Sequence, residues 1–278
     1  MRILVVDAFT DRPFGGNPAG VCLLDGPADP AWMQRLAAEM KHAETAFVRR
    51  VDAAGADYEL RWFTPKVEVA LCGHATLATA HALYTTGAVP SDRPIRFQTL
   101  HSGVLTVRRA AADRLEMDFP AVPAAPVAAP ESLAAALGVT PVWTGRNAQN
   151  DILAVLDDAE TVRKLSPDHG RLAAIEARGI CVTAPDAPPY DFVSRFFAPS
   201  VGIPEDPVTG SAHCMLAPYW ADRLGRLTMT GYQASERGGA VGVAVRGDVV
   251  TLTGQAVTVL DGTLQIRPGS GVQTAPCE

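Results

Sequence analysis

A short glycine-centred motif occurs twice in this chain, once in each half, and constrains the fold more than any other feature. The two copies are Leu71-Cys72-Gly73-His74-Ala75-Thr76 and Val208-Thr209-Gly210-Ser211-Ala212-His213, and each continues into an apolar stretch. An Arg-aromatic-aromatic-x-Pro run precedes each copy, at 61–65 and 195–199. Each copy therefore predicts one unit in which a strand ends, a loop follows and glycine opens a helix. Two such units predict two related halves with one site between them.

The order of predicted elements repeats along the chain and favours α+β packing over a doubly wound parallel sheet. In the first half we expect helices opening near Asp29 and at Gly73, and strands at 3–8, 19–24, 45–51, 58–64 and in an antiparallel meander over 95–119. A Pro/Ala-rich stretch at 119–126 cannot lie in a central strand and marks the boundary. In the second half we expect helices at 131–137, 167–178 and after Gly210, strands at 180–184 and 192–198, and a meander over 241–260. We therefore expect halves at 1–120 and 121–262, with a tail of about 263–278 that returns to the first half.

Composition excludes several classes of function. The formal net charge is −6, and lysine and arginine are scattered, so no basic surface for nucleic acid is predicted. No apolar run approaches the roughly 20 residues that span a bilayer, and the N-terminus lacks a signal-peptide pattern. The 5 cysteines are dispersed without a CxxC pair, which indicates reduced thiols in a cytoplasmic protein.

The two helix starts are candidate anion sites. A glycine that opens a helix leaves backbone N–H groups without partners at the positive end of the helix dipole. Gly73 and Gly210 each provide such a start, suited to a carboxylate or a developing enolate-like oxygen. If the halves face each other across a pseudo-twofold axis, both helix starts meet in one cleft.

Three ionisable side chains accompany the two motifs. Glu44 follows a predicted helix at the start of a strand, where desolvation would raise the pKa of its carboxyl group and suit it to proton transfer; the alternative is a solvated helix-end glutamate. Asp206 either caps the following helix or places an acid opposite Glu44. His74 lies in the first helical turn, where the dipole would keep its imidazole neutral. Ser211 occupies the equivalent place in the second copy, and His213 is expected to pack.

Other catalytic classes lack their motifs. Gly15-Gly16 and Gly238-Gly239 do not have the spacing of a dinucleotide-binding GxGxxG, and no Walker A motif is present, so we expect no nucleotide or nicotinamide cofactor. Gly210-Ser211-Ala212 lacks the GxSxG of a serine hydrolase. The pairs Cys72-x-His74 and His213-Cys214 offer too few ligands at usable spacing, so we expect no metal site.

Several segments in this order resemble the PhzF family of phenazine biosynthesis-like isomerases. They are Asp7-Ala8-Phe9-Thr10, Gly15-Gly16-Asn17-Pro18-Ala19, Glu44-Thr45-Ala46-Phe47, Arg61-Trp62-Phe63-Thr64-Pro65, Cys72-Gly73-His74-Ala75-Thr76, Asp206-Pro207-Val208-Thr209-Gly210-Ser211-Ala212 and Ser235-Glu236-Arg237-Gly238-Gly239. The resemblance implies the diaminopimelate epimerase-like fold, with two pseudo-symmetric halves, each a curved and mostly antiparallel sheet around a central helix. It also implies a homodimer.

The resemblance further implies a reaction and its residues. The founding activity is the isomerisation of trans-2,3-dihydro-3-hydroxyanthranilate by proton relocation, without metal or cofactor. The catalytic glutamate falls on Glu44, and the supporting histidine and aspartate fall on His74 and Asp206. The contacts to a small-molecule carboxylate substrate fall on Gly73, Gly210 and Ser211. Asn17, Arg195 and 149–151 are further candidates for specificity; turn formation by Asn17 and ion pairing by Arg195 are the structural alternatives.

Two rival functions stay open. Racemases and epimerases of this fold use a cysteine from each half, but here the counterpart of Cys72 is Thr209, which cannot act as an acid or base at neutral pH. Cys72 alone could still lead such a reaction, or be a buried small apolar residue. The second rival is a non-catalytic protein that binds a small molecule or a partner.

Overall fold

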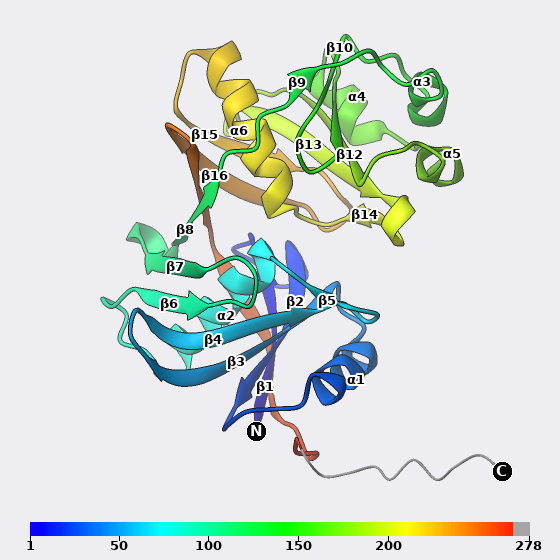
Figure 1. The fold of residues 1–278 in the computed structure, drawn as a ribbon. Helices are drawn as coiled ribbons and strands as arrows, with labels where there is room; N and C mark the ends of the chain where they lie inside the picture. The colour runs from blue at the N-terminus through cyan, green and yellow to red at the C-terminus, as the bar shows by residue number, and fades with distance from the viewer. Residues whose placement is uncertain (269–278) are drawn as a thin grey trace, which may run out of the picture.

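The computed structural model describes residues 1–268 and divides into two halves with the same connectivity (Figure 1). The strands of the first half are β1 (Arg2–Ala8), β2 (Asn17–Leu24), β3 (Glu44–Ala53), β4 (Ala56–Phe63), β5 (Glu68–Val69), β6 (Ile95–Gln98), β7 (Val104–Arg109) and β8 (Leu115–Pro120). The later strands are β9 (Ala125–Pro126), β10 (Trp143–Arg146), β11 (Asp151–Val155), β12 (Gly179–Pro185), β13 (Phe192–Ala198), β14 (Ile203–Asp206), β15 (Thr228–Gln233), β16 (Gly239–Arg246), β17 (Val249–Gly254) and β18 (Ala256–Thr263). The helices are α1 (Pro30–Met40), α2 (Gly73–Thr85), α3 (Leu133–Leu137), α4 (Ala159–Lys164), α5 (His169–Ala173) and α6 (Gly210–Leu224), with 3₁₀ turns at Ala111–Asp113 and Pro199–Val201.

Strand pairing demonstrates the internal symmetry. In the first half β1–β2 is antiparallel, β2–β3 parallel, β3–β4 antiparallel and β4–β6 parallel, followed by the antiparallel β6–β7–β8 meander. The second half repeats this sequence of directions in β10–β11, β11–β12, β12–β13, β13–β15 and the β15–β16–β17 meander. The α+β class, the two pseudo-symmetric halves and the mostly antiparallel sheet are therefore confirmed.

One helix lies against the inner face of each sheet. The side chains of α2 are buried almost all round, and α2 packs on β1, β2, β3, β8 and β18. Helix α6 packs in the same way on β15, β16 and β17. Helix α1 covers the outer side of the first half, and α3, α4 and α5 lie on the outer side of the second (Figure 1). The two central helices therefore start close to the junction of the halves.

The repeated Arg-aromatic-aromatic run has a structural role in both halves. Arg61 donates from Nε to Glu68 Oε1 at 2.7 Å, and Arg195 donates from Nε to Glu205 Oε1 at 2.7 Å. Each guanidinium also lies over the ring two residues later, 5.4 Å from the centre in the first half and 5.0 Å in the second. The four aromatic side chains of the two runs are buried. Arg195 therefore holds β13 to β14, the ion-pairing alternative, rather than reaching a substrate.

Two predicted segments lie elsewhere than expected. The strand expected at the end of the second meander, β18, pairs with β1 from Arg2↔Thr263 to Ala8↔Ala256. The chain thus returns to the first half at residue 256 instead of about 263. The amide of Leu264 still donates to Met1 O in the first half. Residues 269–278 of the expected tail lie outside the described part. The helix expected over 167–178 is helical only in α5, because its capping residue Asp168 starts a single short turn that ends at Ala174.

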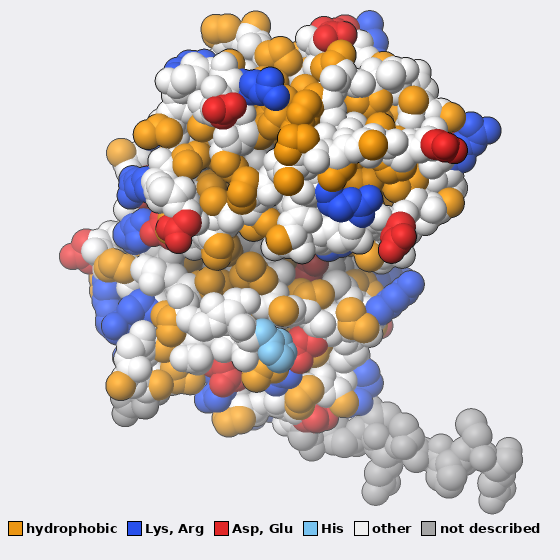
Figure 2. Space-filling model, turned by 45° about the horizontal axis from the view of Figure 1, so that its top comes forward, with side chains coloured by type: hydrophobic (Ala, Val, Ile, Leu, Met, Phe, Trp, Pro, Cys, Tyr) orange, Lys and Arg blue, Asp and Glu red, His pale blue; other side chains and the backbone are white. Residues whose placement is uncertain are grey.

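Two observations concern the surface and the lengths of the helices. Acidic and basic side chains are interspersed with hydrophobic ones on the face shown in Figure 2, without a large area of one charge. Within residues 1–268, every helix is too short or too polar to cross a bilayer.

The join between β17 and β18 should not tolerate a side chain at Gly254. A Cβ there would lie 2.4 Å from Phe9 Cδ1 and 3.3 Å from Leu77 Cδ1, and Phe9 is fully buried. We expect Gly254→Ala to lower the free energy of unfolding by about 1–3 kcal/mol through overpacking, measured by urea denaturation. Gly26→Ala is the matched control, since a Cβ at Gly26 meets nothing within 4 Å. Equal effects of the two substitutions would show that the join adapts freely.

Candidate active site

The two helix starts face each other where the halves meet. A Cβ built on Gly73 would lie 3.7 Å from Gly210 Cα, and a Cβ on Gly210 would lie 3.6 Å from Gly73 Cα. The residues before them, Cys72 and Thr209, make no side-chain capping hydrogen bond. The first amide groups of both helices are therefore available as donors, and two positive dipole ends meet in one place.

Glu44 and His74 form the first part of the site. Glu44 is the first residue of β3, and its Oε2 lies 3.3 Å from His74 Nε2; the two side chains are 14% and 6% exposed. Burial lowers the pKa of His74 to about 3, so the imidazole is neutral near pH 7 and the contact is not an ion pair of opposite charges. Desolvation is the main cause of this neutrality, and the nearby His42 adds to it.

Two side chains lie near His74 Nδ1. Asn17 Nδ2 lies 3.3 Å from this nitrogen, and Cys72 Sγ lies 3.5 Å from it. Within residues 1–268, His74 Nε2 is buried without a hydrogen-bond partner, although Glu44 Oε2 lies 3.3 Å away. Neutral His74 therefore lies against the Glu44 carboxyl group and helps to exclude water from it.

Asp206 connects the second half to this cluster. Its Oδ1 accepts from Asn17 Nδ2 at 2.8 Å and its Oδ2 accepts from Thr209 Oγ1 at 2.6 Å. It makes no capping bond to α6, so the capping alternative is wrong. Although the residue is only partly buried, desolvation of its carboxylate raises its pKa to about 6. The hydrogen bonds from Thr209 and Asn17 act in the opposite direction and lower the pKa. The tertiary structure thus joins Glu44, His74 and Asp206 through Asn17; we call these three side chains the acid–base cluster.

Glu44 has the electrostatics of a proton-transfer group. Desolvation is the main reason that its pKa is raised to about 7, and the negative charge of Asp206 raises it further. A carboxyl group whose pKa lies near the working pH can both accept and release a proton. The predicted desolvation of Glu44 is present, and the solvated helix-end alternative does not describe it.

Asn17 and Ser211 have different surroundings from those that their motifs suggested. The amide nitrogen of Asn17 is occupied by Asp206, His74 and Val208 O, the last at 2.9 Å, while its Oδ1 is buried without a partner. Ser211 Oγ accepts from Arg178 Nη2 at 3.3 Å. Asn17 therefore supports the cluster through its nitrogen, and Ser211 lies at the α6 start beside an arginine.

His213 packs, as expected. Its Nδ1 lies 2.9 Å from Thr209 O, and its ring lies 6.0 Å from the centre of Phe192. Burial lowers the pKa of His213 to about 4.

Two further residues belong to the site although no motif pointed to them. Gln233 accepts from the Thr209 amide at 2.8 Å and donates to Asp206 O at 2.8 Å, which fixes the loop before α6. Arg178 reaches Ser211 from the loop before β12. An alignment of the two halves on their Arg-aromatic runs, without gaps, would have placed Arg178 at the position of Glu44.

Within residues 1–268, the group of side chains that could hold a metal ion is Glu44, Cys72 and His74. Their ligand atoms lie within 4.8 Å of one another, a group that the spacing in the sequence did not reveal. Burial and the charge of Glu44 raise the pKa of the Cys72 thiol well above its usual range. A protonated thiol is a poor ligand and a poor base. The expectation of a site without metal stays a prediction.

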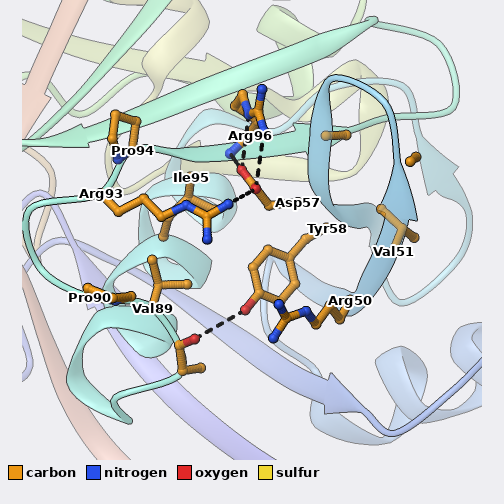
Figure 3. A pocket seen from close by; sticks show the side chains of 13 residues that line it. Arg50, Val51, Asp57, Tyr58, Val89, Pro90, Arg93, Pro94, Ile95 and Arg96 are labelled. Atoms are coloured by element: carbon orange, nitrogen blue, oxygen red, sulfur yellow. Dashed lines mark hydrogen bonds and ion pairs between the residues drawn. The ribbon is translucent and has the colours of Figure 1, made fainter.

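A cavity of about 850 Å³ lies beyond the other end of α2 and contains no member of the acid–base cluster (Figure 3). In it Asp57 accepts from Arg93 Nη2 at 2.5 Å and from Arg96 Nε at 3.2 Å, and Tyr58 faces Ala88 O. These pairs occupy the charged groups of two of its arginines. The residues that the motifs pointed to therefore lie at the junction of the halves and not in this cavity.

Comparison with known proteins identifies the family. The model of the phenazine biosynthesis-like protein family, PhzC-PhzF, matches residues 6–262. An uncharacterized isomerase from Pseudomonas aeruginosa is 48% identical over 267 residues, which cover 96% of this chain and 99% of that protein. The crystal structure of a PhzF-family protein from Enterococcus faecalis matches with a TM-score of 0.87 and 39% identity, covering 94% of this chain and 97% of that chain. A hydroxyproline epimerase from Agrobacterium vitis, 12% identical, shares the fold with a TM-score of 0.63 over 94% of this chain and 91% of that chain.

Fold, site and relatives together define an enzyme of the isomerase class built on the epimerase-like fold. The chain belongs to the PhzF family of phenazine biosynthesis-like proteins, as its motifs indicated.

Ionised Glu44 should destabilise the folded chain at alkaline pH. Its pKa is about 7 in the folded protein and about 4.3 in an unfolded chain. The folded state binds more protons between these values, so stability decreases as pH rises through them. We expect the free energy of unfolding of Glu44→Gln to be about 2–3 kcal/mol higher than that of wild type at pH 8. At pH 4.5 the two values should agree within about 1 kcal/mol.

Urea denaturation at both pH values measures this difference. Glu39→Gln is the control, since Glu39 is exposed on α1. Its free energy of unfolding should differ from that of wild type by the same small amount at both pH values. A Glu44→Gln effect that does not change with pH would mean that Glu44 titrates like a free glutamate.

Proposed function

We propose that this isomerase moves a proton between two carbon atoms of a small carboxylate that is cyclic or unsaturated, with Glu44 as the general base. The observation that carries the proposal is the position of Glu44, whose pKa is about 7, beside neutral His74 and the facing helix starts. A base needs a pKa near the working pH, and the carbanion that it forms needs donors for its charge. Both requirements are met within one cluster.

In the proposed reaction the Glu44 carboxylate accepts a proton from carbon. The electron pair left behind is delocalised over the unsaturated system and the substrate carboxylate, and Glu44 returns the proton to another carbon. Product and substrate then have the same composition, and no electrons are gained or lost. Neutral His74 lies 3.3 Å from the Glu44 carboxyl group and helps to keep water from it, and ionised Asp206 strengthens the base by repulsion.

The substrate carboxylate is assigned to the helix starts. Uncapped amide groups at Gly73 and Gly210 and the Ser211 hydroxyl provide donors there. The reaction implied by the family resemblance, isomerisation of trans-2,3-dihydro-3-hydroxyanthranilate, has a substrate of this class, which makes that compound the first one to test.

Incubation in D₂O tests the role of Glu44. We expect wild-type protein to introduce carbon-bound deuterium into trans-2,3-dihydro-3-hydroxyanthranilate or a related unsaturated carboxylate, followed by NMR. Glu44→Gln keeps the shape of the side chain but cannot accept a proton, so exchange should slow by about 10²–10⁴-fold. The wild-type rate should rise with pH through about 7 as Glu44 ionises.

The control is Glu39→Gln, which should exchange at the wild-type rate. Full exchange by Glu44→Gln would exclude Glu44 as the base. Carboxylate binding by wild-type protein without exchange of any compound tested would favour the rival function, a binding protein without turnover.

The first rival, a racemase or epimerase reaction led by Cys72, predicts that the cysteine and not Glu44 is essential. Because the pKa of this thiol is well above its usual range, the thiolate is scarce at neutral pH. We expect Cys72→Ala to retain exchange within about 10-fold of wild type, the loss reflecting its packing and its contact with His74. Loss of exchange in Cys72→Ala with full exchange in Glu44→Gln would assign the reaction to the cysteine.

A further inference from the structure

Strand register identifies the counterpart of Glu44 in the second half. Phe63 and Phe197 occupy the same place in the repeated Arg-aromatic run; Phe63 pairs with Thr45, and Phe197 pairs with Ile180. The residues before these partners, Glu44 and Gly179, are therefore equivalent. The parallel pairs of the two halves agree, since their first pairs are Ala19↔Glu44 and Asp151↔Gly179.

The second half has no room for a base at this position. A Cβ on Gly179 would lie 2.2 Å from Phe196 Cζ and 2.7 Å from Phe196 Cε1, because the ring occupies that space. The guanidinium of Arg178 lies over the same ring, 5.7 Å from its centre. The half opposite Glu44 therefore presents an aromatic ring and a cation where the first half presents a carboxylate.

The side chain of Arg178 contacts the start of α6. Its Nη2 donates to Asp151 Oδ2 at 2.5 Å, to Ser211 Oγ at 3.3 Å and to Gln149 Oε1 at 3.3 Å. Its positive charge also lowers the pKa of Asp206, whereas burial raises this pKa by a larger amount. Arg178 thus contacts the helix start, and its charge acts on Asp206 of the acid–base cluster.

Neutralisation of Asp151 explains only part of this arrangement. The Asp151 side chain is 0% exposed and needs a cation, but the Arg178 side chain is 39% exposed. All of the side-chain hydrogen bonds that Arg178 makes within residues 1–268 come from Nη2. Nη1 has no protein partner there, and Nε is buried without one. An arginine that serves only a buried acid would not be expected to leave Nη1 without a protein partner beside an uncapped helix start.

We propose that Arg178 is a specificity residue that binds the substrate carboxylate through Nη1, together with the Ser211 hydroxyl and the α6 amide groups. This inference rests on the proposed function, from which it takes the carboxylate class of the substrate. It deepens that function by adding a fixed charge to the anion site. Arg178 selects an anion over a neutral group of the same shape, while Glu44 performs the proton transfer from the other half.

Binding of a carboxylate and its neutral amide tests the proposal. The probes are 3-hydroxyanthranilate and 3-hydroxyanthranilamide, and the measurement is isothermal titration calorimetry. Since Arg178→Met alone leaves Asp151 buried without a cation, the main variant is the double substitution Arg178→Met/Asp151→Asn. Arg171→Met is the control, because Arg171 is 61% exposed on α5 and pairs only with Asp168.

We expect wild type, Glu44→Gln and Arg171→Met to prefer the carboxylate. The double variant should bind the carboxylate about 10- to 100-fold more weakly, the effect of one hydrogen bond to a charged group, and the amide within about 3-fold of wild type. Arg178→Lys should recover part of the preference, because it restores the charge. If the role of Arg178 were purely structural, the double variant would lose affinity for both probes by the same factor.

Equal weakening of the two probes, an unchanged preference in the double variant, or absence of a carboxylate preference in wild type would each overturn the assignment of Arg178. Failure of the proposed reaction is distinguishable from these outcomes. Loss of preference in the double variant without deuterium exchange by wild type would support Arg178 and exclude the reaction. Deuterium exchange by wild type, together with an unchanged carboxylate preference in the double variant, would support the reaction and exclude the assignment of Arg178.

Discussion

The approach of two helix starts across the junction of the halves is the constraint on which the rest of the site depends. A Cβ on Gly73 or Gly210 would lie within van der Waals contact of the Cα of the other, and neither helix is capped by the side chain of the residue before it. Two uncapped, positive helix ends repel each other and leave donors without partners. This cost is offset when an anion binds between them, so the same arrangement that weakens the fold locally prepares a binding site.

The buried charges around these helices are arranged asymmetrically. The first half supplies Glu44 and neutral His74, and the second supplies Asp206, Arg178 and buried Asp151. Asn17 connects the halves by donating to Asp206 and facing His74. Because the halves share one topology, this asymmetry comes from the residues at equivalent positions and not from a difference in fold.

Much of the fold could be predicted because it repeats. The central helices, the Arg-aromatic strands and the meanders follow from local patterns that occur twice, and a copied pattern is stronger evidence than a single one. The predictions were wrong where the partner is distant or the signal weak. The alternation in 256–260 indicated a strand, but its pairing with β1 depends on residues about 250 positions away. The short α5 could not be distinguished from a longer helix by its apolar positions.

The identity of the candidate base, the glycine helix starts and the two-half architecture follow from the amino-acid sequence alone, because each is carried by residues that are neighbours in the chain. The neutrality of His74 was expected, but its cause, burial, is a property of packing. The contacts of Asn17 with Asp206, of Gln233 with Thr209 and of Arg178 with Ser211 arise only in the folded chain. They join residues from different elements, and the pKa of each group depends on the atoms that exclude water around it, which only the packed halves bring together.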